Sequence, residues 1–455
     1  MPMLILSALV AVVPQGELEG DATPPPPVAE RLVERALADN RAHALLADLV
    51  AAAPQRLAGS PGMARAREWA KATMTALGLE NVRVEPVTVP RWERGETATL
   101  TGDGVRFDVA ALGGSIGTPE GGITAPVLMV RSFEELRARA DEAKGRIVFF
   151  NRPMPRVLRN TFRAYGAAVP QRGNGAIEAA KVGAVAAIVR SMTTLLDDLP
   201  HTGTLRYEDG VPPIPAAAIS TNGAEALAAR IAEQGTVELT LRLDCRPAGE
   251  GRCGNVVGEI RGTRAPEEIV LIGAHLDAWD LGHGAHDDGA GCVHCLEAVR
   301  LILACGLRPA RTVRVVLFTN EENGLRGARG YAEAHADELA AHVAALETDR
   351  GGFEPKGFDT TLEEAARRRL VPALAPLREL GMGALIEGGG GADISVLRPH
   401  GVPLFGLIVA DHRYFDFHHS AADVLGAVNE RELALGAAAV AAMTVVLADP
   451  ELFPR

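Results

Sequence analysis

The sequence has few aromatic residues, few cysteines and no cluster of basic residues. Aromatic residues make up 4% of the 455 residues, and 58 acidic against 46 basic side chains give a formal net charge of −12. Because a nucleic-acid-binding surface needs concentrated positive charge, this balance excludes nucleic acid as an expected partner. Five cysteines are too few for a disulfide scaffold. No internal apolar run is long enough to cross a bilayer, so we expect no membrane span.

The N-terminus and two cysteines bear on the cellular compartment. A short apolar run at residues 4–13 precedes proline-rich sequence. We interpret residues 1–27 as a possible secretory signal and linker, although a basic start and a clean cleavage site are missing. We therefore expect a secreted or periplasmic protein and leave a cytoplasmic one open. If the chain is exported, Cys245 and Cys253, which flank a Pro/Gly-rich loop, are expected to form a disulfide bond.

The composition is otherwise that of a globular α/β protein, with 47% hydrophobic residues. Short apolar strands alternate with helical segments along most of the chain. Residues 121–247 follow this alternation but carry no cluster of metal ligands or nucleophiles, so we predict a separate small α/β insert there. Residues 28–120 and 248–455 should then form the main domain, a mixed and mostly parallel sheet flanked by helices.

The most informative stretch runs from residue 267 to residue 305. Its apolar start, residues 269–272, is typical of a strand buried on both faces of a sheet. His275 and Asp277 follow two positions apart, so on an extended chain they point the same way. A glycine-rich loop then carries Asp287 and Asp288. Taken alone, the His-x-Asp pair is more often a surface feature, and the aspartate pair is also what a helix N-cap requires.

Three further apolar strands end on acids or histidines, at the edge where open α/β sheets bind ligands. These are residues 312–319 before Glu321 and Glu322, residues 342–346 before Asp349, and residues 403–409 before the loop with His418 and His419. Two imidazoles and three carboxylates exceed the needs of one tetrahedral zinc. They suit two ions that share a bridging carboxylate. Glu321 is then a spare acid that can act as base, although a Glu-Glu pair alone is more typical of a solvated loop.

The motifs HLDAWD, AHDDGAG, NEE, ETD and HHSAAD, in this order, resemble those of the M28 metallopeptidases, and most closely the carboxypeptidase Q branch. The segments VPRWERGE, GAIEAAKVGAVA, PHTG and DGVPPIP extend the resemblance, which covers roughly residues 28–450. It implies the zinc exopeptidase fold, with the insert as a protease-associated (PA) domain. It also implies a possible homodimer.

The resemblance assigns roles residue by residue. It implies that two zinc ions are held by His275 and Asp349 at one position and by Glu322 and His419 at the other, with Asp287 as the bridge. Glu321 would be the general base that takes the proton of a metal-bound water, and Asp277 would orient His275. The family also implies a cis peptide bond between Asp287 and Asp288.

Three residues are candidates for contacts with the substrate. His418 stands where some family members carry tyrosine and would stabilise the oxyanion, unless it is a solvent-facing loop residue. Arg350 departs from the small residue typical of the branch. It would bind a C-terminal carboxylate, unless it pairs with Glu347 or Asp393. Asp393 lies in Gly-Ala-Asp where the family often has Gly-Thr-Asp, which bears on substrate preference.

The sequence thus predicts a zinc exopeptidase that acts on short peptides, in particular dipeptides with free termini. A broader aminopeptidase acting on longer peptides is the main alternative. A non-catalytic receptor-like scaffold is disfavoured because all five ligands and the base are present. A glutaminyl cyclase is disfavoured because it would use one metal rather than two.

Overall fold

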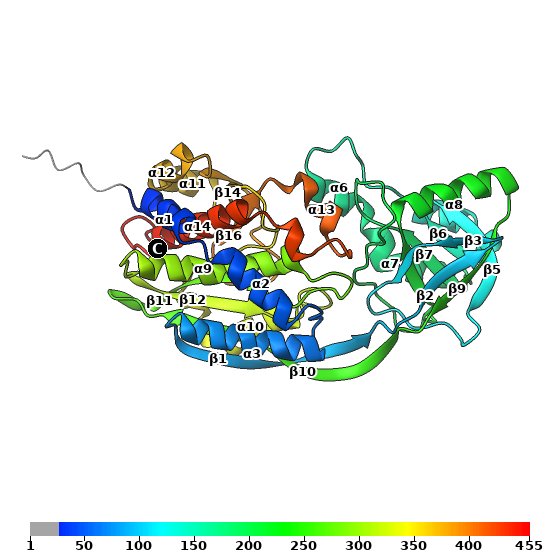
Figure 1. Cartoon of the computed structure of the whole chain (residues 1–455), viewed down its shortest axis with the longest axis horizontal. Helices are drawn as coiled ribbons and strands as arrows, with labels where there is room; N and C mark the ends of the chain where they lie inside the picture. The colour runs from blue at the N-terminus through cyan, green and yellow to red at the C-terminus, as the bar shows by residue number, and fades with distance from the viewer. Residues whose placement is uncertain (1–26) are drawn as a thin grey trace, which may run out of the picture.

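The computed structural model describes residues 27–455. The apolar run at residues 4–13, on which the expectation of export rests, lies outside them. Within the described residues, no helix is both long enough and apolar enough to cross a membrane. Two eight-stranded sheets, one toward each end of an elongated molecule, organise this part of the chain (Figure 1).

The main domain is built on a mixed sheet. In spatial order its strands are β1 (Glu80–Glu93), β10 (Arg246–Ile260), β12 (Arg311–Phe318), β11 (Ala265–His275), β13 (His342–Glu347), β16 (Leu404–Val409), β14 (Pro355–Thr360) and β15 (Ala384–Glu387). The central strands β12, β11, β13 and β16 run parallel. All of β12 and residues 269–275 of β11 are buried, which explains their apolar sequence. The predicted mixed α/β fold with flanking helices is confirmed.

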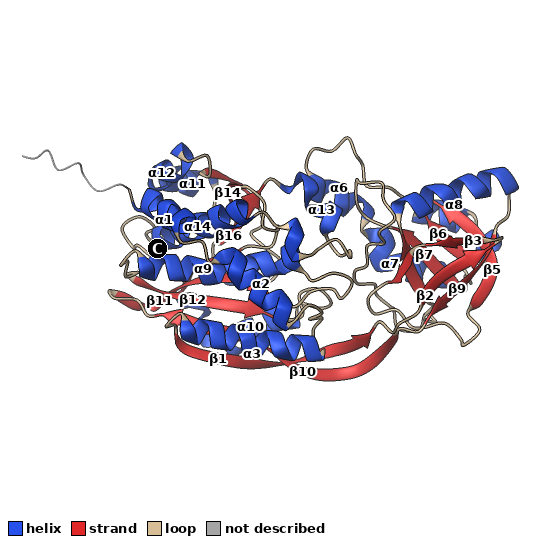
Figure 2. Cartoon of the chain, viewed as in Figure 1, coloured by secondary structure: helices blue, strands red, loops and turns tan. Residues whose placement is uncertain are grey.

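Helices cover both faces of this sheet (Figure 2). One face carries α1 (Val28–Ala38), α2 (Ala42–Ala52), α3 (Pro61–Ala76), α9 (Ala290–Ala304), α11 (Glu364–Leu370), α12 (Ala375–Glu379) and α14 (Glu430–Leu447). The other carries α10 (Arg326–Ala334) with the short 3₁₀ helices η2 (Ala336–Ala341) and η4 (Ile394–His400). Because both faces are covered, ligands reach the parallel strands only at their ends.

The second sheet belongs to the insert. Its strands, in spatial order, are β3 (Val105–Phe107), β2 (Ala98–Gly102), β9 (Glu238–Leu243), β5 (Ile123–Val130), β6 (Ile147–Phe150), β7 (Ala186–Arg190), β8 (Ala216–Ile219) and β4 (Val109–Ala111). The helices of the insert are α4 (Phe133–Ala138), α5 (Ala140–Ala143), α6 (Thr161–Ala168), α7 (Pro170–Lys181) and α8 (Thr221–Gln234). The sheet already includes β2, so the insert starts well before the expected residue 121. The strands between residues 98 and 111 have only three to five residues each, and a tight turn separates the first two, which hides them in the sequence.

The long antiparallel ribbon of β1 and β10 connects the two domains (Figure 1). The Pro/Gly-rich segment between Cys245 and Cys253 is part of this ribbon and not a loop. Eight residue steps of extended chain span about 26 Å, whereas a disulfide requires Cα atoms within about 7 Å of each other. Both thiols are free and buried, Cys245 in the core of the insert and Cys253 in that of the main domain. The predicted disulfide bond is wrong.

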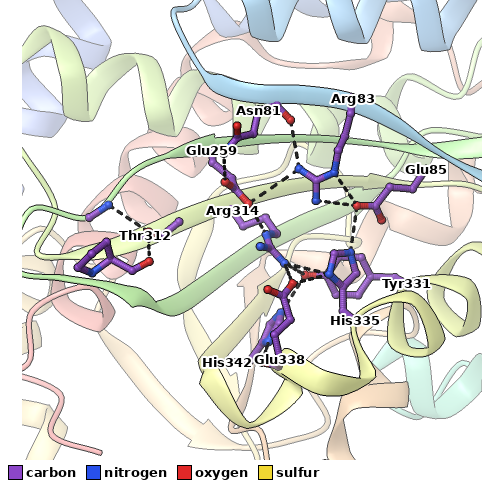
Figure 3. A network of polar contacts seen from close by, with 12 residues as sticks. Asn81, Arg83, Glu85, Glu259, Thr312, Arg314, Tyr331, His335, Glu338 and His342 are labelled. Carbon is purple, nitrogen blue, oxygen red and sulfur yellow. Dashed lines mark hydrogen bonds and ion pairs between the residues drawn. The ribbon is translucent and has the colours of Figure 1, made fainter.

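A buried polar network lies on the α10 side of the sheet (Figure 3). Arg314 of β12, only 6% exposed, donates to Glu259 at 2.7 Å, to the Tyr331 hydroxyl at 2.9 Å and to Glu338 at 2.5 Å. His342 lies 3.0 Å through Nδ1 from the Glu338 backbone oxygen and 2.8 Å through Nε2 from the Tyr331 hydroxyl. The buried guanidinium is therefore paired on two sides with carboxylates.

Candidate metal centre

His275 ends β11, and its imidazole is oriented by the following turn. Nδ1 lies 2.9 Å from the backbone oxygen of Asp277, so Nδ1 carries the proton and Nε2 is left free to bind a metal. The Asp277 carboxylate, which we expected to orient His275, is 4.0 Å from Nδ1 and instead accepts the backbone N–H of Glu321 at 3.2 Å. Asp277 thus fixes His275 through its backbone and Glu321 through its side chain.

Asp287 lies between two histidines. Its Oδ1 is 3.3 Å from His275 Nε2, and its Oδ2 is 3.2 Å from His419 Nε2. The Asp287–Asp288 peptide bond is cis, as the family resemblance implies. One carboxylate therefore faces both imidazoles with a different oxygen.

Asp349 and Glu322 complete the two groups. Asp349 Oδ1 is 3.4 Å from His275 Nε2, and Glu322 Oε2 is 3.0 Å from His419 Nε2. Ligand atoms about 3.3 Å apart are what tetrahedral zinc with bonds of about 2.0–2.1 Å requires. Within residues 27–455, Oδ2 of Asp287 and Oδ1 of Asp349 have no hydrogen-bond partner. The structure gathers all five predicted ligands, with Asp287 common to both groups.

The electrostatics of the cluster reflect an excess of carboxylates. Burial raises the pKa of Glu321 well above its usual value, and the charges of Asp349 and Glu322 add to this. Burial and the charge of Asp287 likewise raise the pKa of Glu322. Burial alone would lower the pKa of His419, but the carboxylates of Glu322 and Asp287 outweigh it and raise this pKa to about 9. A divalent cation would relieve the repulsion among these acids.

Two further acids hold the ligand loops in place. Asp423 accepts the backbone N–H groups of His286 at 2.6 Å and Asp287 at 3.1 Å. Asp288 accepts those of His275 at 3.2 Å and Gly291 at 3.0 Å. We did not predict the role of Asp423 or the bond from His275 to Asp288, whereas the bond from Gly291 to Asp288 is the helix-capping contact that the sequence left open for the aspartate pair. The signal was present, because Asp423 closes the His-Ser-Ala-Ala-Asp motif and Asp288 follows the bridging acid.

Comparisons with known proteins identify the family of this chain. A family model described as peptidase family M28 matches residues 255–444. Carboxypeptidase Q of Bos taurus is 38% identical over 421 residues, which are 92% of this chain and 88% of the bovine protein. The chain belongs to peptidase family M28. A crystal structure of an M28 peptidase precursor from Shewanella amazonensis agrees with a TM-score of 0.89 and 38% identity, covering 93% of this chain and 96% of that one.

Membership of family M28 makes the protein a metallopeptidase, as we predicted. A zinc aminopeptidase from Bacillus subtilis shares the fold, with a TM-score of 0.65 and 22% identity over 88% of this chain and 93% of that one. The family implies zinc, and the residues fit it, because the donor atoms are imidazole nitrogens and carboxylate oxygens. The ligand atoms of His275, Asp287 and Asp349 lie within 4.8 Å of one another, as do those of Asp287, His418 and His419, and two of the buried oxygens lack donors.

A cavity of about 640 Å³ opens between this M28 site and the insert. The ligand-bearing loops form one wall. The other wall comes from Phe162, Tyr165 and Arg172 of the insert and from Tyr414 and Phe415 of α13 (Tyr414–Phe417). Figure 1 shows α6 and α13 side by side between the two domains. The sequence did not reveal this wall, because its residues come together only when the domains meet.

His418 is buried within the site and does not face solvent. Its Nε2 lies 3.7 Å from Asp287 Oδ2, and its ring stacks on that of His419 with centroids 3.5 Å apart. His419 lies closer to Asp287, at 3.2 Å, and it alone of the two contacts Glu322. This geometry supports His419 as the ligand and leaves His418 beside the cavity.

Arg350 and Asp393 lie away from the position that we expected for substrate contacts. Arg350 pairs with neither Glu347 nor Asp393 but donates to Asp359 of β14 at 2.5 Å. Neither Arg350 nor Asp393 is among the residues of 27–455 that line the cavity. Asp393 is fully buried, and burial together with the charge of Glu347 raises its pKa. The geometry therefore does not favour Arg350 as the ligand of a substrate carboxylate.

Proposed function

We propose that this metallopeptidase is a co-catalytic two-zinc exopeptidase that hydrolyses short peptides, in particular dipeptides with free termini. The observation that carries the proposal is the position of Asp287 between two pairs of ligands, His275 with Asp349 and Glu322 with His419. Two metal ions that act together on one substrate are typically held by a shared carboxylate in this way.

Zinc bound at both positions would acidify a water molecule and polarise the peptide carbonyl. Glu321 then moves the proton. It lines the cavity, its raised pKa suits a group that both takes and gives a proton, and Asp277 holds its backbone. As the water oxygen bonds to the carbonyl carbon, Glu321 accepts the water proton. It returns that proton to the amine nitrogen as the C–N bond breaks.

Two observations support a short substrate. The insert covers the site, and a cavity of about 640 Å³ has the size of a small-molecule pocket rather than of an extended groove. The bovine relative is named a carboxypeptidase and the Bacillus neighbour an aminopeptidase. A dipeptide presents both termini at a single scissile bond, so one dipeptidase reaction is compatible with either name.

The test combines metal analysis with a substrate panel. Zinc is quantified in the purified chain, and hydrolysis is compared for free dipeptides, their N-acetylated and C-amidated forms, tetrapeptides and an amino-acid anilide. We expect about two zinc ions per chain and the highest kcat/KM for free dipeptides. Equal rates on tetrapeptides and the anilide would replace the proposal with a broader aminopeptidase. Absence of both zinc and hydrolysis would overturn it in favour of a scaffold.

A further inference from the structure

Arg172 of the insert is a buried cation without a carboxylate partner. The side chain lies on α7 and is 6% exposed, and its Nε has no hydrogen-bond partner among residues 27–455. None of its hydrogen bonds within these residues goes to an acid. Burying a charge without an ionic partner is costly, which makes Arg172 a candidate for a role in the site.

The contacts of Arg172 connect a tyrosine to the metal centre. Nη2 lies 2.6 Å from the Tyr165 hydroxyl. Nη1 lies 3.3 Å from the backbone oxygen of Thr202 and 3.3 Å from His419 Nδ1, and that Nδ1 is itself 3.3 Å from the same oxygen. If His419 binds a metal through Nε2, its Nδ1 is protonated, so it and Arg172 both donate to the two lone pairs of the Thr202 oxygen. The insert thus supports the back of a metal ligand.

The hydrogen bond between Arg172 and Tyr165 fixes the direction of the tyrosine proton. A guanidinium can only donate, so the Tyr165 oxygen must accept. The Tyr165 O–H is then free to donate elsewhere. Its ring is held in the cavity wall by stacking on Phe415, with centroids 4.7 Å apart, and by an edge contact to His418 at 5.2 Å. The same cavity is lined by Glu321.

Residue 203 must be glycine for Arg172 to approach His419 this closely. A Cβ on Gly203 would lie 2.3 Å from Arg172 Nη1 and 2.7 Å from His419 Nδ1, and its φ of +130° disfavours other residues. The adjacent His201 contacts the backbone oxygen of His418 at 2.7 Å through Nδ1. Residues 201–203 of the insert therefore pack directly against His418 and His419, with no room for a side chain at position 203.

We propose that Tyr165 is a catalytic residue that the insert contributes, and that it donates a hydrogen bond to the oxyanion of the reaction. Arg172 is the positioning residue that orients its hydroxyl. This inference rests on the proposed peptide hydrolysis. When the water oxygen bonds to the carbonyl carbon, the C=O π electrons move onto the carbonyl oxygen. Tyr165 keeps its proton and stabilises that charge until the C–N bond breaks and the amine leaves with the proton from Glu321.

The first test replaces single hydroxyl groups. Tyr165→Phe should lower kcat for dipeptides about a hundredfold, the usual effect of losing one oxyanion donor, while zinc content is unchanged and KM changes only a few-fold. Tyr207→Phe is the matched control. Its hydroxyl is also in the insert but is bonded to Ile116 N at 3.0 Å and Ile214 O at 2.8 Å, away from the cavity, so kcat should be retained.

The second test separates catalysis from support of the fold. A phosphinate dipeptide analogue mimics the tetrahedral transition state, so its Ki should rise in Tyr165→Phe by about the factor by which kcat/KM falls. Arg172→Met should show the same pattern more weakly. Wild-type kcat in Tyr165→Phe would overturn the inference, as would a Ki that stays unchanged. Tyr414→Phe is measured in parallel, because Tyr414 also lines the cavity. If kcat falls in Tyr414→Phe but not in Tyr165→Phe, Tyr414 is the donor and the inference is overturned. Wild-type protein without dipeptide hydrolysis would instead refute the proposed function itself.

Discussion

Two buried polar clusters lie on the same sheet, and they differ in how their charges are compensated. In the network of Figure 3, burial would raise the pKa of Glu338, but the hydrogen bond and charge of Arg314 outweigh it and the pKa is lowered. At the metal centre, burial and two neighbouring acids raise the pKa of Glu321. Carboxylates near cations remain ionised easily, whereas those of the metal centre repel one another.

The difference indicates that the Arg314 network stabilises the fold, whereas the metal centre carries the chemistry. The Arg314 network provides its own cations, so its contribution is to hold β10, β12 and α10 together. The metal centre is completed only by cations from outside the chain, which is typical of a site that binds and activates a substrate. Substitutions in the network should therefore lower the free energy of unfolding without changing the chemistry. Substitutions in the metal centre should change the chemistry without lowering the free energy of unfolding.

The largest effect is expected at the general base. Glu321→Gln keeps the shape of the side chain but cannot accept a proton, so kcat should fall by about 10²–10⁴ while about two zinc ions remain bound. The midpoint of thermal unfolding should not decrease, because repulsion among the acids is reduced. Steady-state kinetics, metal analysis and thermal denaturation of the same preparation check these outcomes.

Glu322→Gln tests the neighbouring residue, which we assign to metal binding. Its carboxylate lies 3.0 Å from His419 Nε2, so an amide in its place should weaken one of the two zinc positions. We expect zinc content to fall from about two ions per chain to about one after dialysis against a weak chelator. Activity should be partly restored by added zinc. Metal loss in Glu321→Gln and retention in Glu322→Gln would reverse the two assignments.

Arg314→Met should lower the free energy of unfolding by about 3–5 kcal/mol, because it leaves the buried Glu259 carboxylate without the guanidinium 2.7 Å away. Loss of the contact with Glu338, whose side chain is 39% exposed, adds little. The kcat of the folded variant should be unchanged. Arg264→Met is the control: its side chain is 56% exposed and contacts Glu451 at 3.2 Å, an interaction worth no more than about 1 kcal/mol. Urea denaturation measures both. An equal loss of unfolding free energy in the two variants would mean that burial of the Arg314 ion pair does not determine its contribution to stability.

The sequence predicted the main sheet and the gathering of ligands well, for a physical reason. Parallel strands buried on both faces are apolar along their length, so the runs at residues 269–272 and 312–319 are unambiguous. Their carboxyl ends must meet at one edge. Acids and histidines directly after such strands therefore converge, whatever the loops between them do.

Features that depend on contacts between distant segments were not predictable in this way. The ribbon strand β10 contains Pro247 and several glycines, which are typical of a loop, yet pairing with β1 makes it a strand. Arg350 finds its partner Asp359 on β14 only because that strand returns antiparallel beside β16. The positions of Tyr165 and Arg172 depend on how the insert meets the main domain, and no local pattern encodes that.

The smallest effect is expected from a histidine of the Arg314 network. Burial lowers the pKa of His342 to about 4, against 6.5 in the unfolded chain. Its Nδ1 donates to the Glu338 backbone oxygen and its Nε2 accepts from the Tyr331 hydroxyl, an arrangement that requires the neutral ring. Above pH 6.5 both states are neutral. As the pH falls toward 4, only the unfolded state gains the proton, so His342 should contribute a loss of stability that reaches about 3 kcal/mol.

Other buried histidines titrate in the same direction, with the pKa of His286 lowered to about 4 and that of His294 to about 3 by burial. The informative quantity is therefore the difference between wild type and His342→Asn, measured by urea denaturation from pH 7 to pH 4. The variant should be less stable at pH 7, since it loses the Tyr331 hydrogen bond, but its stability should fall less steeply with acid. If the stabilities of wild type and His342→Asn fall in parallel with pH, the network accepts a protonated His342. The hydrogen bonds of His342 would then not require its neutral form.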